Sequence, residues 1–414
     1  MLTKRIVVVG GGPAGMMAAI RAAELKQEVI LIDRNSSLGK KLLLTGKGRC
    51  NITNACDLNS FLERFSKNGQ FLRDAFKSFF NDDLTGFFRA RGLHFKTERQ
   101  LRVFPVTDRS NSIIDILGKE LDKNNVTIIY KSLLEDILIE DSRVKSVSLN
   151  NSSIIPADRI ILCTGGLSYS FTGSDGYGME IAKRLGHAII EPRPGLVPLK
   201  ISQKYPRLLE GLTLKNVRLI FSDGKKEIVS DIGELLFTDS GISGPLVLSL
   251  SGKIIDWLAG GRGVYVEIDL KPALSKEQLN KRILREFEAS PKKAIKNLLK
   301  NFLPKRLIEV FMDMAKISPD KKVSQVPQPE RQEIVSLLKG LRMDISGPLP
   351  IEKAMVTRGG VSLKDINPRT MESRIIKGLY FAGEMIDVDA DTGGFNLQAA
   401  FSTGYLAGQS AALS

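Results

Sequence analysis

A chain of 414 residues is too long to bury one compact core, so we expect roughly two or three structural units. With 43% hydrophobic residues, 26% charged residues and a net charge of +14, the composition is that of a basic globular protein, and no apolar run approaches the roughly 18 residues of a membrane span. Three cysteines (Cys50, Cys56 and Cys163) are too few for a disulfide framework, which favours a reducing compartment and a cytoplasmic location.

The first elements in chain order are a strand, a glycine-rich turn, a helix and a second strand. Residues 5–9 are an apolar run typical of a buried strand, and residues 17–25 carry apolar side chains at helical spacing. Residues 28–33 form the second apolar run. This order predicts the first βαβ unit of a doubly wound α/β sheet.

The turn between this strand and helix carries the pattern G-x-G-x-x-G. Gly10 would make the tight turn, Gly12 would let the backbone approach a pyrophosphate, and Gly15 would let helix and strand pack closely. Pro13 suits the first turn of the helix, whose N-terminus would hold the pyrophosphate. Asp33 ends the second strand and is placed to accept hydrogen bonds from an adenosine ribose. The pattern therefore predicts a dinucleotide site.

Residues 46–54, GKGRCNITN, combine glycines, strong cations, a thiol and asparagines, a composition that does not favour burial. Three roles for Cys50 are open: packing, donating a proton to a substrate carbon, or forming a redox pair with Cys56. A thiol reacts only where its pKa and exposure permit, and the separation of the two cysteines is not a recognised redox spacing. Packing is the favoured interpretation.

Further along, residues 126–140 and 143–166 alternate between strand-like runs and polar turns. Cys163 belongs to the last of these strands and is expected to be buried, and the turn after it would lie against the cofactor. From residue 195 the residue pattern changes to short runs typical of β-strands. After Pro350 the composition is again rich in glycine, as in the first part of the chain. We therefore expect a nucleotide domain built from residues 1–194 and 347–414. Its insert would be residues 195–346, β-rich over 195–270 and helical and basic over 271–346.

Positive charge is concentrated in the insert. Between Lys271 and Arg306 there are eleven Lys/Arg against three acids, a surplus of eight in a chain of net charge +14. A polyanionic partner such as RNA is one explanation, and a solvated helical face is the other. The aromatic candidates for base stacking in the insert are Trp257, Phe287 and Phe302, residue types that are more often found in a core.

The C-terminal part decides between FAD and NAD. Residues 378–404 place a strand end, acids and a Gly-Gly turn before a helix that is expected to begin at Asn396. The N-terminus of that helix offers free N–H groups and a positive dipole end, which can stabilise negative charge on a reduced flavin. A terminal segment that returns in this way to the first βαβ unit indicates FAD.

Four stretches resemble the BaiN/RdsA (YhiN-like) family of NAD(P)/FAD-dependent oxidoreductases: GGGPAGMMAA, GKKLLLTGKGRCNITN, LLFTDSGISGP and TRGGVSLKDINPRTMESRIIKGLYFAGEMIDVDADTGGFNLQAAFSTG. The resemblance spans essentially the whole chain and implies a flavoprotein with a β-barrel and helical insert. It implies that residues 46–54 lie along the FAD, with Lys40, Lys41 and Arg49 near the diphosphate. For the two lysines an ordinary surface position is the alternative. It also implies that Asn51 serves the flavin edge.

The fingerprint and the resemblance together predict the site residues. The predicted cofactor-binding residues are Gly10, Gly12, Pro13, Ala14, Gly15, Asp33, Arg34, Lys40, Lys41, Gly46, Gly48, Arg49, Cys50, Asn51, Leu133, Thr164, Gly165, Gly166, Gly383, Glu384, Asp387, Gly393, Gly394, Asn396, Leu397 and Gln398. The catalytic candidates are Cys50 and Asp239, the latter standing where the family usually has a histidine. His94 and His187 have no partners at metal-ligand spacing, so no metal site is expected.

The resemblance implies reduction of a C=C bond conjugated to a carbonyl. No second G-x-G-x-x-G with a following acid is present, so NAD(P)H, if it is the donor, would have to visit the flavin transiently, or another reductant would serve. The uracil ring and a 3-oxo-4-ene steroid both fit this chemistry. The basic cluster favours dihydrouridine formation in large-subunit rRNA, because a steroid requires only an apolar pocket. A small-molecule enone reductase and a non-catalytic FAD-containing RNA-binding protein are the alternatives, and the oligomeric state stays open.

Overall fold

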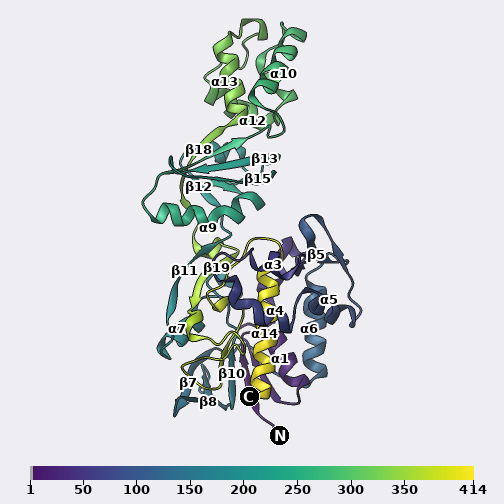
Figure 1. Cartoon of the computed structure of the whole chain (residues 1–414), viewed down its shortest axis with the longest axis vertical. Coiled ribbons are helices and arrows are strands. Elements are labelled where there is room, and N and C mark those ends of the chain that lie inside the picture. The colour runs from purple at the N-terminus through teal and green to yellow at the C-terminus, as the bar shows by residue number, and fades with distance from the viewer. Residues whose placement is uncertain (1–2) are drawn as a thin grey trace. The chain divides into compact units, whose positions relative to one another are not determined.

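The computed structural model describes residues 3–414 and divides into two units (Figure 1). The first unit ends at Gly195 and resumes at Ile351, and the second runs from Leu196 to Pro350. The second unit extends beyond the expected residue 346, because strand β18 (Leu341–Pro348) continues through that position. None of the helices in the described part of the chain is long and apolar enough to cross a membrane.

The first unit is built on a parallel sheet with the strand order β20-β10-β1-β2-β6. Its strands are β1 (Arg5–Val9), β2 (Glu28–Ile32), β6 (Thr127–Ile129), β10 (Arg159–Leu162) and β20 (Leu379–Phe381). The central strand β1 pairs with β2 on one side and with β10 on the other. Strands buried on both faces form continuous apolar runs, as in RIVVV and EVILI.

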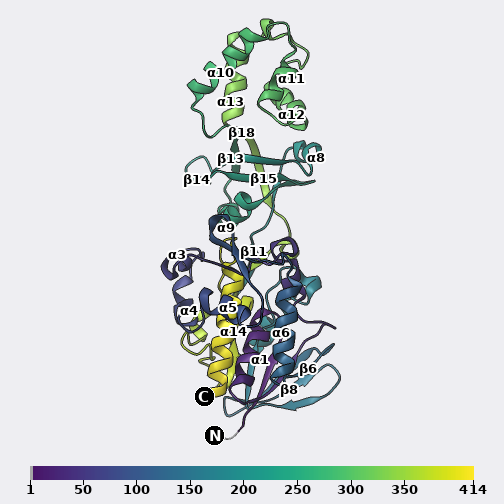
Figure 2. The same ribbon diagram turned by 90° about the vertical axis from the view of Figure 1, so that its right-hand side faces the viewer.

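Two helices from opposite ends of the chain pack together against this sheet. Helix α1 (Pro13–Glu24) lies between α14 (Phe395–Leu413) and α6 (Asn111–Lys123) in both ribbon views (Figures 1 and 2). A Cβ on Gly404 would lie 2.2 Å from the Ala14 carbonyl oxygen, and one on Gly408 would lie 2.3 Å from that of Ala18. Only glycine therefore allows α14 to approach the backbone of α1 this closely.

Smaller elements complete the first unit. The helices are α2 (Lys40–Leu44), α3 (Leu58–Leu62), α4 (Arg73–Ser78), α5 (Asn81–Arg89) and α7 (Tyr177–Arg184), and the strands are β3 (Thr53–Asn54), β4 (Phe95–Thr97), β5 (Arg102–Pro105), β7 (Leu134–Glu140), β8 (Arg143–Leu149), β9 (Ile154–Pro156), β11 (Ile189–Gly195) and β19 (Val356–Val361). Strands β3, β5 and β4 form one antiparallel sheet, β7 to β9 form another, and β11 pairs with β19.

The second unit contains a closed β-barrel. The strand order is β14-β13-β15-β16-β12-β18-β17, and an additional pairing of β13 with β17 closes the ring. The strands are β12 (Leu199–Ile201), β13 (Thr213–Ser222), β14 (Glu227–Val229), β15 (Gly233–Phe237), β16 (Gly241–Ser243), β17 (Val264–Asp269) and β18. Closure removes the exposed edges of all the ring strands, which agrees with the barrel that the family resemblance implied.

The helical part of the second unit lies between β17 and β18. Its helices are α10 (Lys276–Ala289), α11 (Ile295–Leu298), α12 (Lys305–Ala315) and α13 (Gln328–Lys339), while α8 (Tyr205–Leu209) and α9 (Pro245–Ala259) belong to the barrel segment. Two expectations are corrected here. Residues 245–259 form a helix that buries Val247, Ser251 and Ile254 at helical spacing, and residues 341–346 form a strand of the barrel.

The glycine contact between α1 and α14 yields a stability prediction. Gly408→Val should lower the free energy of unfolding by about 3 kcal/mol, because its side chain would overlap the α1 backbone. Gly118→Ala in α6 is the matched control, since its Cβ would meet nothing within 4 Å. It should stabilise the protein by about 0.5 kcal/mol. Chemical denaturation measures both, and a tolerated valine at position 408 would contradict the close packing.

Candidate functional site

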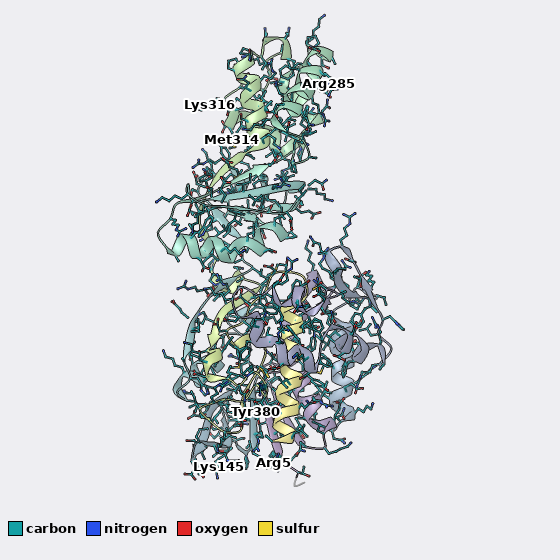
Figure 3. All side chains as sticks on the ribbon, viewed as in Figure 1. Arg5, Lys145, Arg285, Met314, Lys316 and Tyr380 are labelled. Atoms are coloured by element: carbon teal, nitrogen blue, oxygen red, sulfur yellow. The ribbon has the colours of Figure 1, made fainter. Side chains whose placement is uncertain are left out.

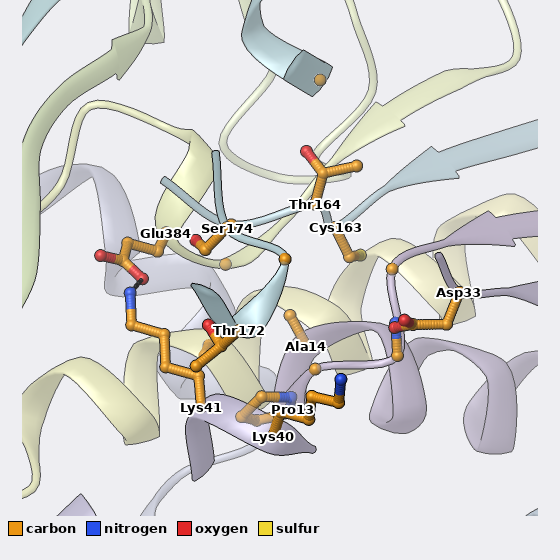
Figure 4. Close-up of a pocket in the computed structure, with 18 of the residues that line it drawn as sticks. Pro13, Ala14, Asp33, Lys40, Lys41, Cys163, Thr164, Thr172, Ser174 and Glu384 are labelled. Atoms are coloured by element: carbon orange, nitrogen blue, oxygen red, sulfur yellow. Dashed lines mark hydrogen bonds and ion pairs between the residues drawn. The ribbon is translucent and has the colours of Figure 1, made fainter. Parts of the chain in front are cut away.

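A cavity of about 220 Å³ lies in the first unit at the carboxyl ends of β1, β2 and β10, beside the N-terminus of α1 (Figure 4). Val9, Ile32 and Cys163 end or follow these strands and line it. In open parallel α/β sheets, ligands bind in the crevice outside the carboxyl ends of the strands. The cavity therefore occupies the position of a dinucleotide site.

Most of the predicted cofactor residues line this cavity. They are Gly10, Gly12, Pro13, Ala14, Asp33, Arg34, Lys40, Lys41, Leu133, Thr164, Gly165, Gly383, Glu384, Asn396 and Leu397. They come from both ends of the chain and from the middle of the first unit, and the parallel sheet with its α1–α14 layer brings them together.

The fingerprint glycines have the geometry that a bound pyrophosphate requires. Gly10 has a φ of 103°, and a Cβ there would lie 2.4 Å from the Cys163 carbonyl oxygen. A Cβ on Gly15 would lie 1.8 Å from the Gly10 carbonyl oxygen, so Gly15 packs the helix on the strand and lies outside the cavity wall. Gly12 is the N-cap of α1, and a Cβ there would meet nothing within 4 Å. The space in front of the helix N-terminus is therefore open to an anion.

Asp33 is held rigidly at the end of β2. One carboxylate oxygen accepts a hydrogen bond from the Gly11 N–H at 2.6 Å, and the other accepts from the Asn35 N–H at 2.7 Å. The side chain is buried and faces the glycine turn in Figure 4. A fixed carboxylate at this position can accept hydrogen bonds from ribose hydroxyls.

Lys40 and Lys41 extend into the cavity rather than lying on the open surface. The Lys41 ammonium pairs with the Glu384 carboxylate, as Figure 4 shows, and donates to the Ser168 hydroxyl at 2.7 Å. The Ser168 hydroxyl donates to the other Glu384 oxygen at 2.8 Å. The Lys40 ammonium donates to the Asn35 amide oxygen at 2.9 Å. With Arg34, the cavity wall thus carries three cations, of which Lys41 is paired with Glu384 and Arg34 with Asp175.

One segment of the wall was missed by the sequence reasoning. Thr172, Gly173, Ser174 and Asp175 line the cavity on the loop between β10 and α7. The loop is tied to the end of β2, because Asp175 pairs with Arg34. The glycines of TGSDGYG, just after a parallel strand and before a helix, were the available signal, and two of them have positive φ.

The N-terminus of α14 also reaches the cavity. The helix begins at Phe395, one residue before the expected start, and Asn396, Leu397 and Ala400 line the wall. Its N-cap Gly394 has a φ of 97°, and a Cβ there would lie 2.3 Å from the Thr53 carbonyl oxygen of β3. The first turn of α14 is thereby fixed beside the segment that follows residues 46–51.

The remaining predicted residues lie outside the cavity wall, namely Gly15, Gly46, Gly48, Arg49, Cys50, Asn51, Gly166, Asp387, Gly393, Gly394 and Gln398. Arg49 is not placed as expected near a diphosphate, because its guanidinium is engaged by Glu98 and Asp108. Asp387 accepts from the Asn68 amide at 3.0 Å, and burial raises the pKa of its carboxyl.

Two of these residues carry a buried acceptor without a partner in the described structure. They are the amide oxygens of Asn51 and Gln398. Gln398 donates its amide to the Ser402 hydroxyl at 2.9 Å inside the α14 packing. Asn51 lies between Thr45, which lines the cavity, and β3, which contacts the N-cap of α14. Both acceptors therefore lie behind the cavity wall and not on its surface.

The environment of Cys50 favours packing over chemistry. Its side chain is fully buried, contrary to the expectation that residues 46–54 stay exposed, and burial raises the pKa of the thiol to about 12. Cys50, Cys56 and Cys163 are all free, so no disulfide joins the first two. Cys163 is buried at the end of β10, as expected from its strand.

The second catalytic candidate lies in the second unit. Asp239 is exposed on the turn between β15 and β16, where its carboxylate accepts from the Ser240 hydroxyl at 3.1 Å. His187 is buried and bonded to the Ala182 carbonyl and the Ser373 hydroxyl. Within residues 3–414, no group of His, Cys, Asp or Glu side chains is gathered in a way that could hold a metal ion.

The basic cluster of the second unit is largely unpaired. The exposed cations of this cluster without an ion-pair partner in the described residues are Lys276, Lys281, Arg282, Arg285, Lys292, Lys293, Lys300, Lys305 and Arg306. Arg285 projects outward from α10 in Figure 3. The aromatic candidates are not exposed platforms, since Phe287 and Phe302 are buried and Trp257 packs against the core.

Comparison with known proteins agrees with this geometry. The family model for the HI0933-like protein Rossmann domain matches residues 4–410. A 3-dehydro-bile acid delta(4,6)-reductase of Clostridium scindens is 32% identical over 411 residues, covering 99% of each chain. A ribosomal RNA dihydrouridine synthase of Escherichia coli is 32% identical over 406 residues, covering 97% of this chain and 96% of that one.

Among solved structures, a 3-ketosteroid delta1-dehydrogenase of Sterolibacterium denitrificans matches with a TM-score of 0.53 and 12% identity, covering 100% of both chains. At this identity the match concerns the fold alone. The family model and the two relatives confirm the resemblance that the motifs indicated, and the fold is the expected FAD-binding Rossmann type.

Gly12 offers a direct test of the cofactor site. Gly12→Asp should abolish FAD binding, because a carboxylate would face the pyrophosphate, while the fold should survive since a Cβ there meets no protein atom. Gly12→Asn has the same size without the charge and should retain more FAD than the aspartate variant. Absorbance at the flavin bands after purification measures the content, and a fully loaded Gly12→Asp protein would refute the site.

The buried thiol makes a second prediction. In the native protein at pH 8, iodoacetamide should label Cys56 and leave Cys50 and Cys163 unmodified, because burial removes access and holds both thiols neutral. Peptide mass spectrometry before and after unfolding reads out each cysteine. Cys50→Ser should retain FAD. Rapid native labelling of Cys50 would instead support a chemical role for the thiol.

Proposed function

The chain belongs to the HI0933-like family and is an FAD-dependent oxidoreductase, and on this premise we propose that it reduces a uridine of large-subunit rRNA to dihydrouridine with NAD(P)H as the electron donor. The C5=C6 bond of uracil is conjugated to the C4 carbonyl. When bound, FAD supplies the hydride for such a bond and accepts one from the nicotinamide. The rest of the task, which is binding and orientation, belongs to the protein.

Each wall of the cavity has a role in this proposal. The N–H groups at the start of α1 would hold the pyrophosphate in front of Gly12, and Asp33 would accept hydrogen bonds from the adenosine ribose. Lys40 and Lys41 add positive charge along the same wall. The N-terminus of α14, with Asn396 in the wall, would offer the positive end of a helix dipole to the flavin ring.

The observation that supports an RNA substrate is the set of unpaired cations in the helical part of the second unit. Between Lys271 and Arg306 there are eleven Lys/Arg against three acids, and nine of these cations are exposed with no ion-pair partner in the described residues. Exposed cations that are not neutralised by the protein release counterions on binding phosphates, which is the main source of RNA affinity. The buried Phe287 and Phe302 leave stacking on the target base to other groups.

A second candidate is the reduction of a small carbonyl-conjugated alkene such as a 3-oxo-4-ene steroid. The relative named as a bile acid reductase is as similar in sequence, at 32% identity, as the one named for rRNA. A small alkene would not need the cations of the helical part for binding, whereas an rRNA substrate would contact them through its phosphates. We therefore rank it second.

Deleting the gene in its host should remove one dihydrouridine from large-subunit rRNA, measured by nucleoside mass spectrometry. Wild-type protein should restore it. A variant with Lys281, Arg285, Lys292 and Lys293 changed to Glu should bind RNA at least about tenfold more weakly at 0.15 M salt, with a flatter salt dependence, and should fail to restore it. FAD content and flavin reduction by NAD(P)H should be unchanged, because these belong to the first unit.

The control variant carries the same charge change on exposed lysines of the first unit, with Lys77, Lys119, Lys183 and Lys377 changed to Glu. It should bind RNA nearly as the wild type does and restore the modification. If the deletion strain keeps every rRNA dihydrouridine, the rRNA substrate is wrong and the small-molecule reductase becomes the better proposal. If the flavin absorbance does not fall when the protein is mixed anaerobically with NAD(P)H, NAD(P)H is not the electron donor.

A further inference from the structure

A second group of unpaired cations lies in the first unit, on residues 94–110, which contain the β4–β5 hairpin, and on the loop of residues 45–49. The cations of these segments are Lys47, Arg49, Lys96, Arg99, Arg102 and Arg109, and the acids are Glu98 and Asp108. Both acids are already occupied, since Arg49 pairs with each of them and Lys96 pairs with Asp108 at 2.5 Å. Within the part of the chain that the structure describes, the cations without an ion-pair partner are Lys47, Arg99, Arg102 and Arg109, called the hairpin patch below.

One half of the hairpin patch is formed where the loop of residues 45–49 meets the turn after β5. The Ser110 N–H donates to the Gly48 carbonyl at 2.8 Å, so the residues just before them, Arg109 and Lys47, are neighbours in the fold. Both of these side chains are exposed. Lys47 has a φ of 60°, a left-handed conformation that is strained at a residue other than glycine and is held by the surrounding contacts.

The other half of the patch lies at the start of β5. Arg102 Nε donates to the Arg99 carbonyl at 3.1 Å, and the Arg102 guanidinium lies 6.0 Å from the centre of the Phe104 ring. The Arg49 guanidinium lies 4.2 Å from the centre of the same ring. Because Arg49 also pairs with Asp108 in the turn after β5, it joins this half of the patch to the first one.

Both halves of the patch are attached to segments that line the cofactor cavity. The loop of residues 45–49 begins at Thr45, which lies in the cavity wall. At the other half, the Asn54 amide donates to the Gln100 carbonyl at 3.0 Å and to the Gly393 carbonyl at 3.2 Å. Residue 393 comes just before α14, whose first turn lines the wall at Asn396. The patch is therefore fixed to the cavity wall at two places.

We propose that the hairpin patch contacts phosphates of the RNA substrate, so that the FAD-binding unit has an RNA surface of its own besides the basic cluster of the second unit. The proposal rests on the rRNA substrate proposed above. Guanidinium groups suit this role, because their planar fork can donate two hydrogen bonds to one phosphate. Phosphate contacts set the position of a nucleic acid. Contacts attached to the cavity wall would hold the RNA chain while one base leaves its stack.

The test measures the affinity for an unmodified large-subunit rRNA transcript as a function of salt, in a variant with Lys47, Arg99 and Arg109 changed to Glu. Affinity at about 0.15 M salt should fall at least about tenfold, and the slope of log affinity against log salt should flatten by about two, since each phosphate contact with a single strand contributes about 0.7. A neutral variant, Lys47→Asn with Arg99→Gln and Arg109→Gln, should flatten the slope equally at the wild-type unfolding midpoint, because asparagine tolerates left-handed backbone. FAD content should be unchanged in both variants.

The matched control makes the same charge change at exposed lysines elsewhere in the first unit, with Lys77, Lys119 and Lys183 changed to Glu. It should bind the transcript nearly as the wild type does, with the wild-type salt slope. Equal losses of affinity in the patch variant and in this control would show an effect of net charge alone and would overturn the proposal.

Two further results would also overturn it. An unchanged affinity and salt slope in both patch variants would show that these cations do not contact RNA. Binding of the wild type to phosphatidylglycerol vesicles, lost in the patch variant at unchanged RNA affinity, would assign the patch to a membrane surface. If the deletion strain keeps every rRNA dihydrouridine while the patch variant binds RNA more weakly, only the substrate is wrong, so the two proposals fail separately.

Discussion

The close approach of α14 to α1 is the contact on which the nucleotide unit depends. Gly404 and Gly408 let the last helix rest on the backbone of Ala14 and Ala18 in the first one. Ala14 also belongs to the cavity wall, so the same contact that joins the chain ends fixes α14 against a wall that its first turn also lines. A cavity assembled from residues 10 and 396 exists only because two glycines remove the side chains that would separate the helices.

The two ends of the cavity recognise their ligand by different physical means. Around Gly12 the donors are backbone N–H groups and a helix dipole, which suit a phosphate of any origin. Along the rest of the wall the groups on offer are charged side chains, of which Lys41 is paired with Glu384 and Arg34 with Asp175.

The sequence predicted those features whose cause is local. The βαβ unit, the positions of Gly10, Gly12 and Asp33, and the C-terminal helix follow from spacing and strand ends, and the structure places all of them at one cavity. It could not predict the partners of Arg49, because Glu98 and Asp108 lie about fifty or more positions away and meet it only through the β4–β5 hairpin. The burial of Cys50 in a polar stretch, and the helix α9 within a β-rich segment, are likewise set by tertiary packing that overrides local composition.

The position of the insert within the chain has a consequence for synthesis. The parallel sheet lacks β20, and α1 lacks its partner α14, until residues 379–413 have been made. The barrel and its helices, by contrast, are one continuous segment from Leu196 to Pro350. On a ribosome the inserted unit can therefore complete its fold first, while the apolar face of α1 stays uncovered for most of translation. The N-terminal unit, although it emerges first, is the last to become a folded domain.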